Sequence, residues 1–564
     1  MKLEKDDMTA NTYDYIVVGA GSAGAVVANR LSASGAHTVL CLEAGTAGSG
    51  YLWSRIPAGV AKLIDNPAVN WCYSSEPDEG SGGRRIDVPR GKMLGGSSSI
   101  NGMVFVRGQP QDYDHWAQLG NRGWSYQDVL PLFKQMESFE GGASDVRGGD
   151  GPLKVTHTER RGVFYDYLIK SAEAVGIKYN PDYNSGDQEG IGLTQATINQ
   201  GRRQSTAYCY LDPARSRPNL TIETGALAQS LILDGKTCVG VRYVVDGEVR
   251  EARATGEVIV SGGSINSPKL LELSGIGRRD VLEKWGIDVV HELPGVGENL
   301  RDHYSPRVKF AVAETAPPFA NDGRGWRIAR EAIKYAFARK GLLATSTVPV
   351  RMYFRSREGL ASPDLTISGL PFLYEIINRE RRIAKRRGIT FNINVLRSES
   401  IGSIHIRSAD PAEPPAIRFN FLSAQHDRDG LLAAMRKARE LMAAPPMRDI
   451  IESEIAPGAD LQSDEELLEW VRNTAETTYH PIGTCKMGHD PMAVVDDRLR
   501  VHGIAGLRVA DASIMPTLTS GNTNAPSIMI GEKCAQMVLS AETEAAAAAL
   551  AQSPSSAIVR HHSA

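Results

Sequence analysis

One glycine-rich segment near the N-terminus constrains the fold of this chain more than any other feature. Gly19-Ala20-Gly21-Ser22-Ala23-Gly24 follows a short apolar run at residues 15–18 and opens a stretch of helix-forming composition that ends at Leu31. A second apolar run follows at residues 38–42. Residues 13–45 therefore predict a strand, a tight turn, a helix and a second strand, which is the βαβ unit of an α/β fold.

The residue types in this segment suit the binding of a dinucleotide. Gly19 permits the tight turn, Gly21 lets the backbone approach a pyrophosphate, and Gly24 allows close packing of helix and strand. The helix N-terminus offers free N–H groups and the positive end of its dipole to the phosphates. Glu43, at the end of the second strand, can accept hydrogen bonds from ribose hydroxyls and would repel a 2′-phosphate. This pattern does not separate NAD from FAD, and a glycine-rich turn in an unrelated α/β fold is the alternative.

A second block rich in glycine and serine runs from Arg90 to Gly102. Its consecutive small residues present N–H groups that can surround an anion or run along a flat ring. The alternative is a flexible surface linker, but the strand-like Met103-Val104-Phe105-Val106 follows at once. Together with Glu43-Ala44-Gly45, this block favours FAD over NAD.

Composition excludes several classes of protein. The formal net charge is −3, so no basic field of the whole chain points to nucleic acid. The six cysteines are scattered without a C-x-x-C pair, which argues against a disulfide scaffold and fits a reducing compartment. The charged start of the chain has no secretory signal, and no apolar run reaches the ~18 residues of a membrane span. His489 and His502 lack the spacing of metal ligands, so we expect a cytoplasmic protein without a metal site.

The rest of the chain alternates between strand and helix patterns. Residues 218–262 alternate in the manner of strands, residues 425–474 are largely helical, and a last helix is expected to end at Ser540. Residues 321–340 and 376–388 are basic and are predicted to be helical. These basic segments are either two solvated helix faces or an edge that contacts anionic lipid at the inner face of a membrane.

Five motifs, in this order, resemble those of the glucose–methanol–choline (GMC) oxidoreductase family. The first two are the glycine-rich blocks at residues 19–24 and 90–102. The others are Gly263-Ser264-Ile265-Asn266-Ser267-Pro268-Lys269-Leu270-Leu271-Glu272-Leu273-Ser274-Gly275-Ile276-Gly277, His480-Pro481-Ile482-Gly483-Thr484-Cys485-Lys486-Met487-Gly488, and Asp511-Ala512-Ser513-Ile514-Met515-Pro516 leading to Ser520-Gly521-Asn522-Thr523-Asn524-Ala525-Pro526. The resemblance runs from about residue 13 to 540. It is strongest to the bacterial choline dehydrogenase and alcohol dehydrogenase branch.

The resemblance implies a doubly wound, Rossmann-like FAD-binding domain beside a substrate domain whose antiparallel sheet is backed by helices. We expect residues 13–160, 212–312 and 470–540 to form the FAD-binding domain. Residues 161–211 and 313–469 are expected to form the substrate-binding domain. The low-complexity residues 541–564 are expected to be a disordered tail.

The resemblance also assigns residues to the cofactor: the first block to ADP, the second to the flavin, Ala226 to adenine and Asp511 to the pyrophosphate. The full set is Gly19, Gly21, Ser22, Ala23, Gly24, Glu43, Ala44, Arg90, Gly95, Gly96, Ser97, Asn101, Gly102, Met103, Val104, Ala226, Asp511, Ala512, Asn522, Thr523, Asn524 and Pro526. Some relatives attach FAD through a histidine in the second block. Here Ser98-Ser99-Ile100-Asn101 contains none, so we expect non-covalent, dissociable FAD.

His480 is the candidate catalytic base. Histidine titrates near neutrality, where a general base works best, although a lone histidine is more often structural. The resemblance aligns His480 with the family's catalytic histidine and Asn524 with its partner position. It implies that His480 takes the hydroxyl proton of an alcohol, that a hydride passes to flavin N5 to give a carbonyl, and that Asn524 hydrogen-bonds the substrate oxygen.

Two alternatives to an FAD-dependent alcohol dehydrogenase or oxidase stay open on sequence alone. One is a non-redox member of the same fold, of the hydroxynitrile lyase or fatty-acid photodecarboxylase type. The chain has no cysteine between Cys238 and Cys485, where the photodecarboxylases carry a functional one. The other is a flavoprotein without catalysis. The electron acceptor, oxygen or a quinone or dye, is also left open, as are the alcohol and the oligomeric state.

Overall fold

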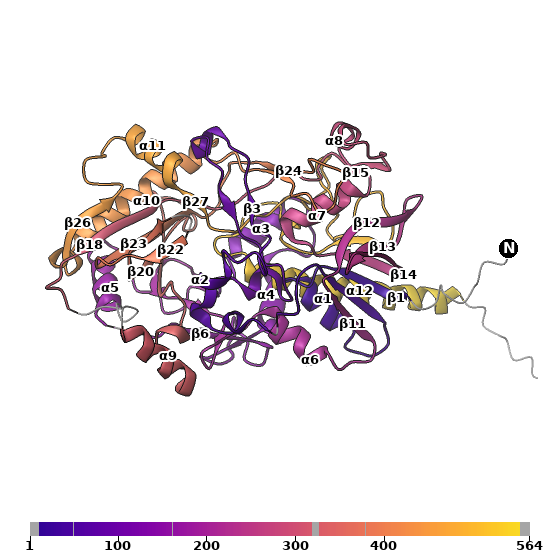
Figure 1. The fold of residues 1–564 in the computed structure, drawn as a ribbon, viewed down its shortest axis with the longest axis horizontal. Coiled ribbons are helices and arrows are strands. Elements are labelled where there is room, and N and C mark those ends of the chain that lie inside the picture. Colours follow the sequence, from indigo (N-terminus) through magenta and orange to yellow (C-terminus); the bar gives the residue numbers. More distant parts are fainter. Residues whose placement is uncertain (1–10, 49, 161, 318–325, 378–379, 553–564) are drawn as a thin grey trace, which may run out of the picture.

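The glycine-rich N-terminal segment forms the predicted βαβ unit. The computed structural model describes residues 11–48, 50–160, 162–317, 326–377 and 380–552 (Figure 1). In it β1 (Thr12–Val18), α1 (Gly24–Leu31) and β2 (Val39–Glu43) follow one another, and β1 pairs with β2 in parallel. The last four residues of β1 and all of β2 are buried, as expected of strands inside a parallel sheet. The carboxyl ends of both strands thus meet at the N-terminus of α1.

These strands belong to a seven-stranded sheet with the order β11-β2-β1-β14-β13-β12, in which β28 also pairs with β14. The other members are β11 (Leu220–Thr224), β12 (Leu227–Asp234), β13 (Thr237–Val245), β14 (Glu248–Val260) and β28 (Leu507–Val509). The first half of β14 is antiparallel to β13, and its second half is parallel to β1 and β28. The predicted strands at residues 218–262 are confirmed.

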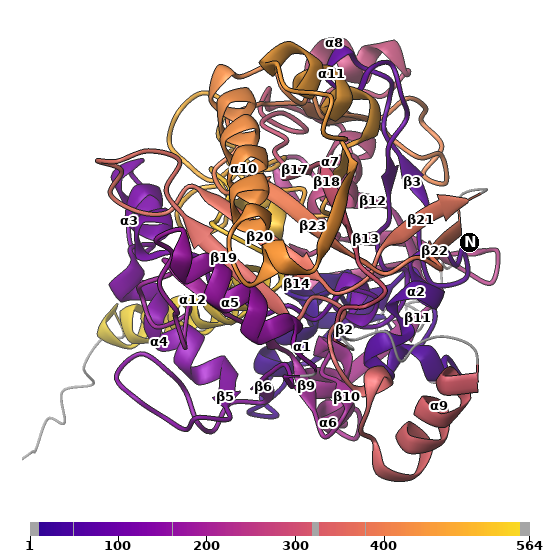
Figure 2. The ribbon, with the colours of Figure 1, turned by 90° about the vertical axis from the view of Figure 1, so that its left-hand side faces the viewer.

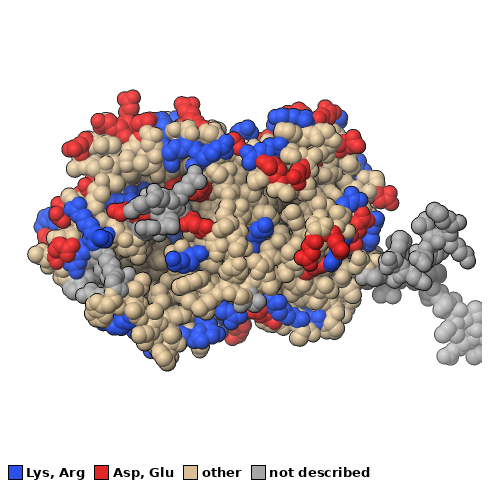
Figure 3. Space-filling model, in the orientation of Figure 1, with Lys and Arg blue, Asp and Glu red and all other residues tan. Residues whose placement is uncertain are grey.

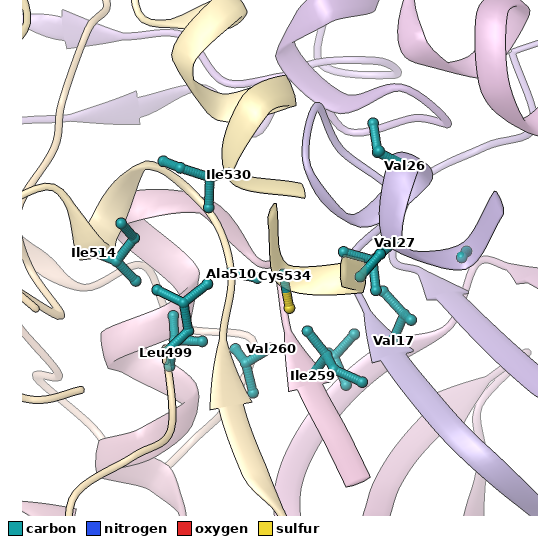
Figure 4. Packing of buried hydrophobic residues seen from close by; sticks show 14 of the residues in the cluster. Val17, Val26, Val27, Ile259, Val260, Leu499, Ala510, Ile514, Ile530 and Cys534 are labelled. Atoms are coloured by element: carbon teal, nitrogen blue, oxygen red, sulfur yellow. The ribbon is translucent and has the colours of Figure 1, made fainter. Parts of the chain in front are cut away.

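The main hydrophobic core lies between this sheet and the helices α1 and α12 (Asn524–Gln552). Figure 4 shows Ile530 and Cys534 of α12 together with Val27 of α1 and Ile259 of β14. The two helices cross closely because of Gly531: a Cβ atom there would lie 2.6 Å from the carbonyl oxygen of Ala23. This packing fixes the start of α12, and the loop before it, beside the glycine-rich turn.

A second sheet of six strands has the order β26-β18-β23-β20-β19-β7, and every pairing is antiparallel. Its members are β7 (Gly190–Leu193), β18 (Arg307–Val312), β19 (Val350–Phe354), β20 (Leu365–Leu370), β23 (Gly388–Val395) and β26 (Ile451–Ala456). The helices α10 (Gln425–Ala443) and α5 (Phe164–Ala174) cover one face (Figure 2). The predicted antiparallel sheet backed by helices is confirmed.

Along β23 apolar and polar side chains alternate, so the two faces of this sheet differ in polarity. Ile389, Phe391, Ile393 and Val395 belong to the core on the helix side. The residues between them, Thr390, Asn392 and Asn394, point to the opposite face, because successive side chains of a strand alternate. The helix-free face of the sheet is therefore polar in its middle.

Three sequence expectations differ from the structure. Residues 376–388 were expected to be helical, but β21 (Tyr374–Ile377) and β22 (Glu380–Ile383) form an antiparallel hairpin. Isoleucines favour a strand, and the backbone register pairs residue 375 with residue 382. The segment expected for the FAD-binding domain ended at residue 312 and so included β18. In the structure β18 is a strand of the second sheet, which places the end of that segment before β18. The helix α12 continues past Ser540 to Gln552, because alanine and glutamate are strong helix formers. Residues 553–564 lie outside the described residues.

The predicted basic helix of residues 321–340 is confirmed over α9 (Trp326–Ala338), and residues 321–325 lie outside the described residues. The predicted helical content of residues 425–474 comes from α10 and α11 (Asp464–Thr474). The other helices are α2 (Val60–Leu63), α3 (Pro110–Gln118), α4 (Tyr126–Met136), α6 (Asp212–Ala214), α7 (Gly263–Leu273) and α8 (Arg279–Lys284). The short strands are β3 (Tyr73–Ser74), β4 (Asp87–Val88), β5 (Glu137–Phe139), β6 (Leu153–His157), β8 (Gln195–Ala196), β9 (Ile198–Asn199), β10 (Arg202–Arg203), β15 (Ile276–Gly277), β16 (His291–Glu292), β17 (Tyr304–Ser305), β24 (Ser403–His405), β25 (Ala416–Arg418) and β27 (Glu476–Thr477).

Candidate active site

The glycines of the first block each do what the sequence predicts of them. Gly19 has φ +102°, a conformation that L side chains rarely adopt, and a Cβ there would lie 2.4 Å from the carbonyl oxygen of Ser261. A Cβ on Gly24 would lie 1.9 Å from the carbonyl oxygen of Gly19. A Cβ on Gly21 would meet nothing within 4 Å, because this residue borders open space. No side chain caps the N-terminus of α1, so the positive end of the helix dipole is open to a phosphate.

Glu43 is buried at the end of β2 and holds the turn together. Its Oε2 accepts a hydrogen bond from the Ala20 N–H (3.1 Å) and its Oε1 from the Gly45 N–H (2.8 Å). Burial raises the pKa of this carboxyl to about 7, while the two N–H groups act in the opposite direction. Glu43 thus carries a structural task besides the predicted contact with a ribose, for which it retains further acceptor lone pairs.

The second block packs directly on the first. Gly95 donates its N–H to the Ala20 carbonyl (2.8 Å), and a Cβ on Gly96 would lie 2.8 Å from Gly21 Cα. Residues 96–99 form one short 3₁₀ turn. Arg203 Nη1 donates to the Asn101 carbonyl (2.6 Å) and fixes the end of the block. The two glycine-rich segments therefore form one continuous wall, which excludes the linker interpretation.

These segments line a cavity of about 400 Å³ that extends from the N-terminus of α1 to the second sheet. Of the predicted cofactor residues, Gly19, Gly21, Ser22, Ala23, Glu43, Ala44, Arg90, Gly96, Ser97, Asn101, Gly102, Met103, Val104, Ala226, Asp511, Ala512, Asn522, Thr523 and Asn524 line it. The cavity lining does not include Gly24, Gly95 or Pro526. Gly24 and Gly95 instead shape the two turns. Arg90 also donates from Nη2 to the Tyr479 carbonyl (2.6 Å), so it holds the segment that carries His480.

The cavity fits a dinucleotide flavin. Gly21 opens the wall where a pyrophosphate would approach the N-terminus of α1, and Glu43 and Ala226 lie at the same end. The run from Ile100 to Val104 lines the far part, where a flat ring would lie. Ile100 is in the wall with no histidine beside it in sequence, so non-covalent binding stays our prediction.

His480 lies at the other end of the cavity, where two segments far apart in the sequence run side by side. Residues 301–303 and 478–482 exchange backbone hydrogen bonds, for example between Ile482 and Arg301. The buried Asp302 accepts the His480 N–H at Oδ1 (2.9 Å) and bonds the Thr477 hydroxyl through Oδ2. Tyr479 adopts φ +69°, which turns the chain so that the imidazole of His480 faces the cavity. The backbone of this segment is thus held before any ligand binds.

The hydrogen bonds assign one tautomer to the His480 ring. His303 Nε2 lies 2.8 Å from the Leu396 carbonyl, which only accepts, so His303 carries its proton on Nε2. Burial lowers the pKa of His303 to about 4, and its Nδ1 is therefore an acceptor. That atom lies 3.0 Å from His480 Nδ1, which must donate. The lone pair of His480 is left on Nε2, in the cavity, where a proton acceptor is needed.

The surroundings of His480 favour its neutral form. Burial lowers its pKa well below the ordinary value of 6.5, and His303, Arg90 and Arg351 act in the same direction. The direction of this shift favours the neutral imidazole, which is the form that can accept a proton. A base that is unprotonated throughout the neutral range is available without a pH-driven activation step.

The amide beside His480 belongs to Asn522 and not, as predicted, to Asn524. Asn522 Nδ2 lies 2.9 Å from His480 Nε2, whereas Asn524 Oδ1 accepts a hydrogen bond from the Ser22 hydroxyl (2.8 Å). The reason is local: Asn524 is the first residue of α12 and faces the glycine-rich turn, while Asn522 precedes the helix, after Gly521 with φ +148°. Both side chains border the cavity, but they do so at different ends.

Sequence reasoning missed His303, Asp302 and Arg351. Arg351 Nη1 donates to Asn522 Oδ1 (2.9 Å), which turns the Asn522 amide so that its Nδ2 faces His480. Asp302 and His303 are adjacent in the run Leu300-Arg301-Asp302-His303, and an acid next to a histidine could have marked this run as a candidate part of the site. Arg351 lies in an ordinary strand pattern, and no local feature marks it.

Among the described residues, no group of three or more histidine, cysteine, aspartate or glutamate side chains is arranged to hold a metal ion. His489 and His502 lie near one another, with ring centroids 6.5 Å apart, and His489 Nε2 lies 3.6 Å from Asp497 Oδ2. The terminal His561 and His562 lie outside the described residues.

We expect Glu43→Ala to release FAD more readily than the parent does. The change removes the ribose acceptor and also frees the Ala20 N–H of the turn, and each charge-assisted hydrogen bond is worth about 1.5–3 kcal/mol. Glu43→Gln keeps one acceptor oxygen and should lie between the two. FAD released by acid precipitation and FAD retained on gel filtration measure the effect. Retention equal to that of the parent in Glu43→Ala would remove Glu43 from the cofactor site.

Two family models match the chain, and both are described as GMC oxidoreductase. The N-terminal model matches residues 13–305 and the C-terminal model matches residues 398–531, which together cover more than half of the chain. The matched ranges contain both glycine-rich blocks, His480 and Asn522.

Known proteins agree with this match. An oxygen-dependent choline dehydrogenase of Brucella anthropi is 40% identical over 528 residues, which cover 93% of this chain and 95% of that protein. The protein of the same name from Escherichia coli is 42% identical over 535 residues, with the same coverage. Among solved structures, a formate oxidase of Aspergillus oryzae superposes with TM-score 0.87 at 26% identity, covering 95% of this chain and 99% of that one. Pyridoxine 4-oxidase of Mesorbium loti gives TM-score 0.83 at 28% identity, covering 93% and 98%.

The comparisons therefore confirm the predicted fold, cofactor and enzyme class. Nothing in them favours a lyase, a photodecarboxylase or a flavoprotein without catalysis. This chain belongs to the GMC oxidoreductase family, and it is an FAD-dependent oxidoreductase of alcohols.

Proposed function

We propose that the enzyme oxidises a CH–OH group to a carbonyl with His480 Nε2 as the base and Asn522 as the second group on the substrate oxygen. The observation that carries this proposal is the chain of hydrogen bonds from the Leu396 carbonyl through His303 to His480 Nδ1, which leaves the Nε2 lone pair in the cavity. FAD, when bound, would supply the hydride acceptor.

The residues of the chain divide the remaining work. The substrate hydroxyl replaces the direct contact between His480 Nε2 and Asn522 Nδ2, so that the imidazole accepts its proton and the amide donates to its oxygen. Arg351 keeps the amide turned toward this oxygen. The low exposure of the site strengthens both interactions as negative charge develops on the oxygen.

The test of this function is identification of the product together with the electron acceptor. Relatives carry the name oxygen-dependent choline dehydrogenase, and solved neighbours are oxidases, which supports oxygen as an acceptor. A panel of alcohols should yield one carbonyl per oxygen consumed, and a soluble quinone analogue tested without oxygen reports the other acceptor. Alcohol-dependent turnover with neither acceptor would contradict the proposed cycle.

We also propose that α9 contacts an anionic membrane. Within the described part of the chain, none of the helices combines the length and the apolar composition that a bilayer span requires, so any contact would be peripheral. A helix on a globular protein ordinarily turns its apolar face inward. On α9, Trp326, Ile333 and Phe337 are instead 72%, 61% and 90% exposed, and their spacing places them on one face.

The surroundings of this face support an anionic lipid surface as its partner. Arg330 and Lys334 are exposed beside it, while the acidic Glu331 is buried and accepts the Leu342 N–H (2.7 Å). In Figure 3 the region where α9 lies in Figure 1 projects with an uncharged tip and with Lys and Arg side chains around it. Aromatic and aliphatic side chains flanked by cations are typical of helices that lie in the membrane interface.

We expect the variant with Trp326→Ser, Ile333→Ser and Phe337→Ser to bind vesicles containing an anionic phospholipid more than tenfold more weakly than the parent. Burial of each of these side chains is worth about 1.5–3 kcal/mol. Flavin reduction by alcohol should be unchanged, because α9 lies outside the cavity. Val249→Ser, at an equally exposed apolar residue in the β13–β14 hairpin, is the matched control. Parent protein that fails to sediment with anionic vesicles would contradict the proposal.

A further inference from the structure

The substrate end of the cavity has a row of polar side chains contributed by four neighbouring strands. Arg351 of β19 is the cross-strand partner of Ser368 of β20, Ser368 is the partner of Asn392 of β23, and Asn392 is the partner of Arg307 of β18. All four residues line the cavity, together with Asn394 on the same face of β23. The middle of the sheet thus presents cations and amides to the ligand.

Arg351 is a buried cation without a carboxylate partner among the described residues. It is 5% exposed, it donates from Nε to the Tyr353 hydroxyl (2.9 Å) and from Nη1 to Asn522 Oδ1 (2.9 Å), and its guanidinium carbon lies 5.5 Å from the centroid of the Tyr353 ring. Its Nη2 group makes no hydrogen bond to any described residue. An uncompensated buried charge is costly, and the cost is removed when an anion binds. Arg307, by contrast, is neutralised by Glu476 (2.5 Å).

A second donor at the same end is unsatisfied. Asn394 is 7% exposed, and its Nδ2 has no hydrogen-bond partner in the part of the chain that the structure describes. Nearly all buried polar groups of native proteins are paired, so an unpaired amide in a cavity wall points to a ligand that accepts hydrogen bonds. Arg351 and Asn394 therefore point independently to a ligand rich in oxygen acceptors.

The same lining is unsuited to a quaternary ammonium group. The acidic residues in it are Glu43 and Asp511, and both hold backbone N–H groups at the nucleotide end of the cavity. Recognition of such a cation needs a carboxylate or free aromatic faces. Of the two aromatic residues in the lining, Trp71 has Tyr73 stacked on it (5.6 Å between ring centroids) and Lys92 Nζ 4.7 Å from its ring, so with Tyr479 the lining does not form a cage of several aromatic faces.

We propose that the substrate is an alcohol bearing a carboxylate, which is held by Arg351 and Asn394, and not a cationic alcohol. This inference rests on the proposed function and names its substrate class. One amide group, that of Asn522, separates Arg351 from His480, so the carboxylate must stand close to the reacting carbon, as in a 2- or 3-hydroxy acid. His480 Nε2 accepts the hydroxyl proton, FAD when bound would take the hydride, and the substrate would thereby become the 2- or 3-oxo acid.

The test compares probes that differ in charge and length, mixed with the holoenzyme without oxygen: lactate, 3-hydroxybutyrate, 6-hydroxyhexanoate, lactamide and choline. We expect lactate or 3-hydroxybutyrate to reduce the flavin with the highest ratio of rate to dissociation constant. Arg351→Met also loosens the Asn522 amide for every substrate, so the expected result is a loss in that ratio that is about 10²-fold larger for these acids than for lactamide. Arg351→Lys should recover part of the loss, since it keeps the charge without the planar fork. Arg355→Met, which removes an arginine paired with Glu189 outside the cavity, should change nothing.

A binding measurement separates failure of this proposal from failure of the proposed chemistry. Propionate has no hydroxyl group and cannot be oxidised, so it reports binding alone. It should perturb the flavin spectrum of the parent and not that of Arg351→Met. Propionamide should change neither spectrum. Preference for choline or lactamide, or equal losses for acid and amide in Arg351→Met, would overturn the proposal. If no alcohol reduces the flavin, the proposed function fails, and propionate binding still decides whether the anion site exists.

Discussion

His480→Ala is expected to lower the rate of flavin reduction by alcohol about 10²–10⁴-fold, the usual worth of general-base catalysis. The lone pair on Nε2 is the proton acceptor that the hydrogen-bond pattern places at the substrate end of the cavity, and no second histidine lines it. FAD content should stay near that of the parent, because the cofactor contacts lie at the other end. Rapid mixing without oxygen gives the rate, and the flavin absorbance of the purified variant gives the cofactor content.

The pH dependence supplies the control for this variant. Neutral His480 is the active form, and its pKa is held well below 6.5, so the parent rate should be level from neutral to alkaline pH and fall only in acid. The acid limb should disappear in His480→Ala, whose remaining rate has no base to protonate. A parental rate in His480→Ala would end the assignment of the base.

Asn522→Ala is expected to lower flavin reduction about 10²–10³-fold, as the loss of one donor to a developing oxyanion commonly does. The amide donates to the substrate oxygen but does not titrate, so the acid limb of the pH profile should persist. Asn524→Ala is the matched comparison, since the same amide is removed two residues away. It loses the hydrogen bond with Ser22 at the glycine-rich turn, so it should weaken FAD retention and leave reduction of the loaded enzyme within a few-fold.

The reverse pattern would contradict the geometry of the site. If Asn524→Ala slowed reduction of FAD-loaded enzyme and Asn522→Ala did not, the amide on the substrate oxygen would be Asn524. Measuring both variants at saturating FAD separates loss of cofactor from loss of catalysis.

The local sequence determines much of the fold. The βαβ unit follows from apolar runs and the turn at Gly19, and the strands of residues 218–262 follow from alternation. The segment at residues 376–388 could not be assigned in this way, because its charged residues fit a solvated helix as well as an edge hairpin. Pairing of Tyr374 with Ile383 decides between them, and that is a contact between strands rather than a local propensity.

Most residues of the cavity wall at the glycine-rich turns were predictable, because backbone geometry sets them and glycine leaves a signal in the sequence. The hydrogen-bond partners of His480 were not, because they depend on side-chain direction. Asn522 and Asn524 differ by two residues, yet the start of α12 falls between them and sends their amides to opposite ends of the cavity. His303 and Arg351 meet His480 and Asn522 only through the packing of distant segments, which no spacing along the chain reveals.

Anaerobic mixing of the FAD-loaded enzyme with alcohols, followed at the visible absorbance of the flavin, tests the central claim most directly. The account predicts that at least one alcohol bleaches the parent flavin in a single turnover and yields one carbonyl per FAD, while His480→Ala loaded with the same FAD bleaches at least 10²-fold more slowly. Bleaching of both proteins at the same rate, or of neither by any alcohol, would contradict it.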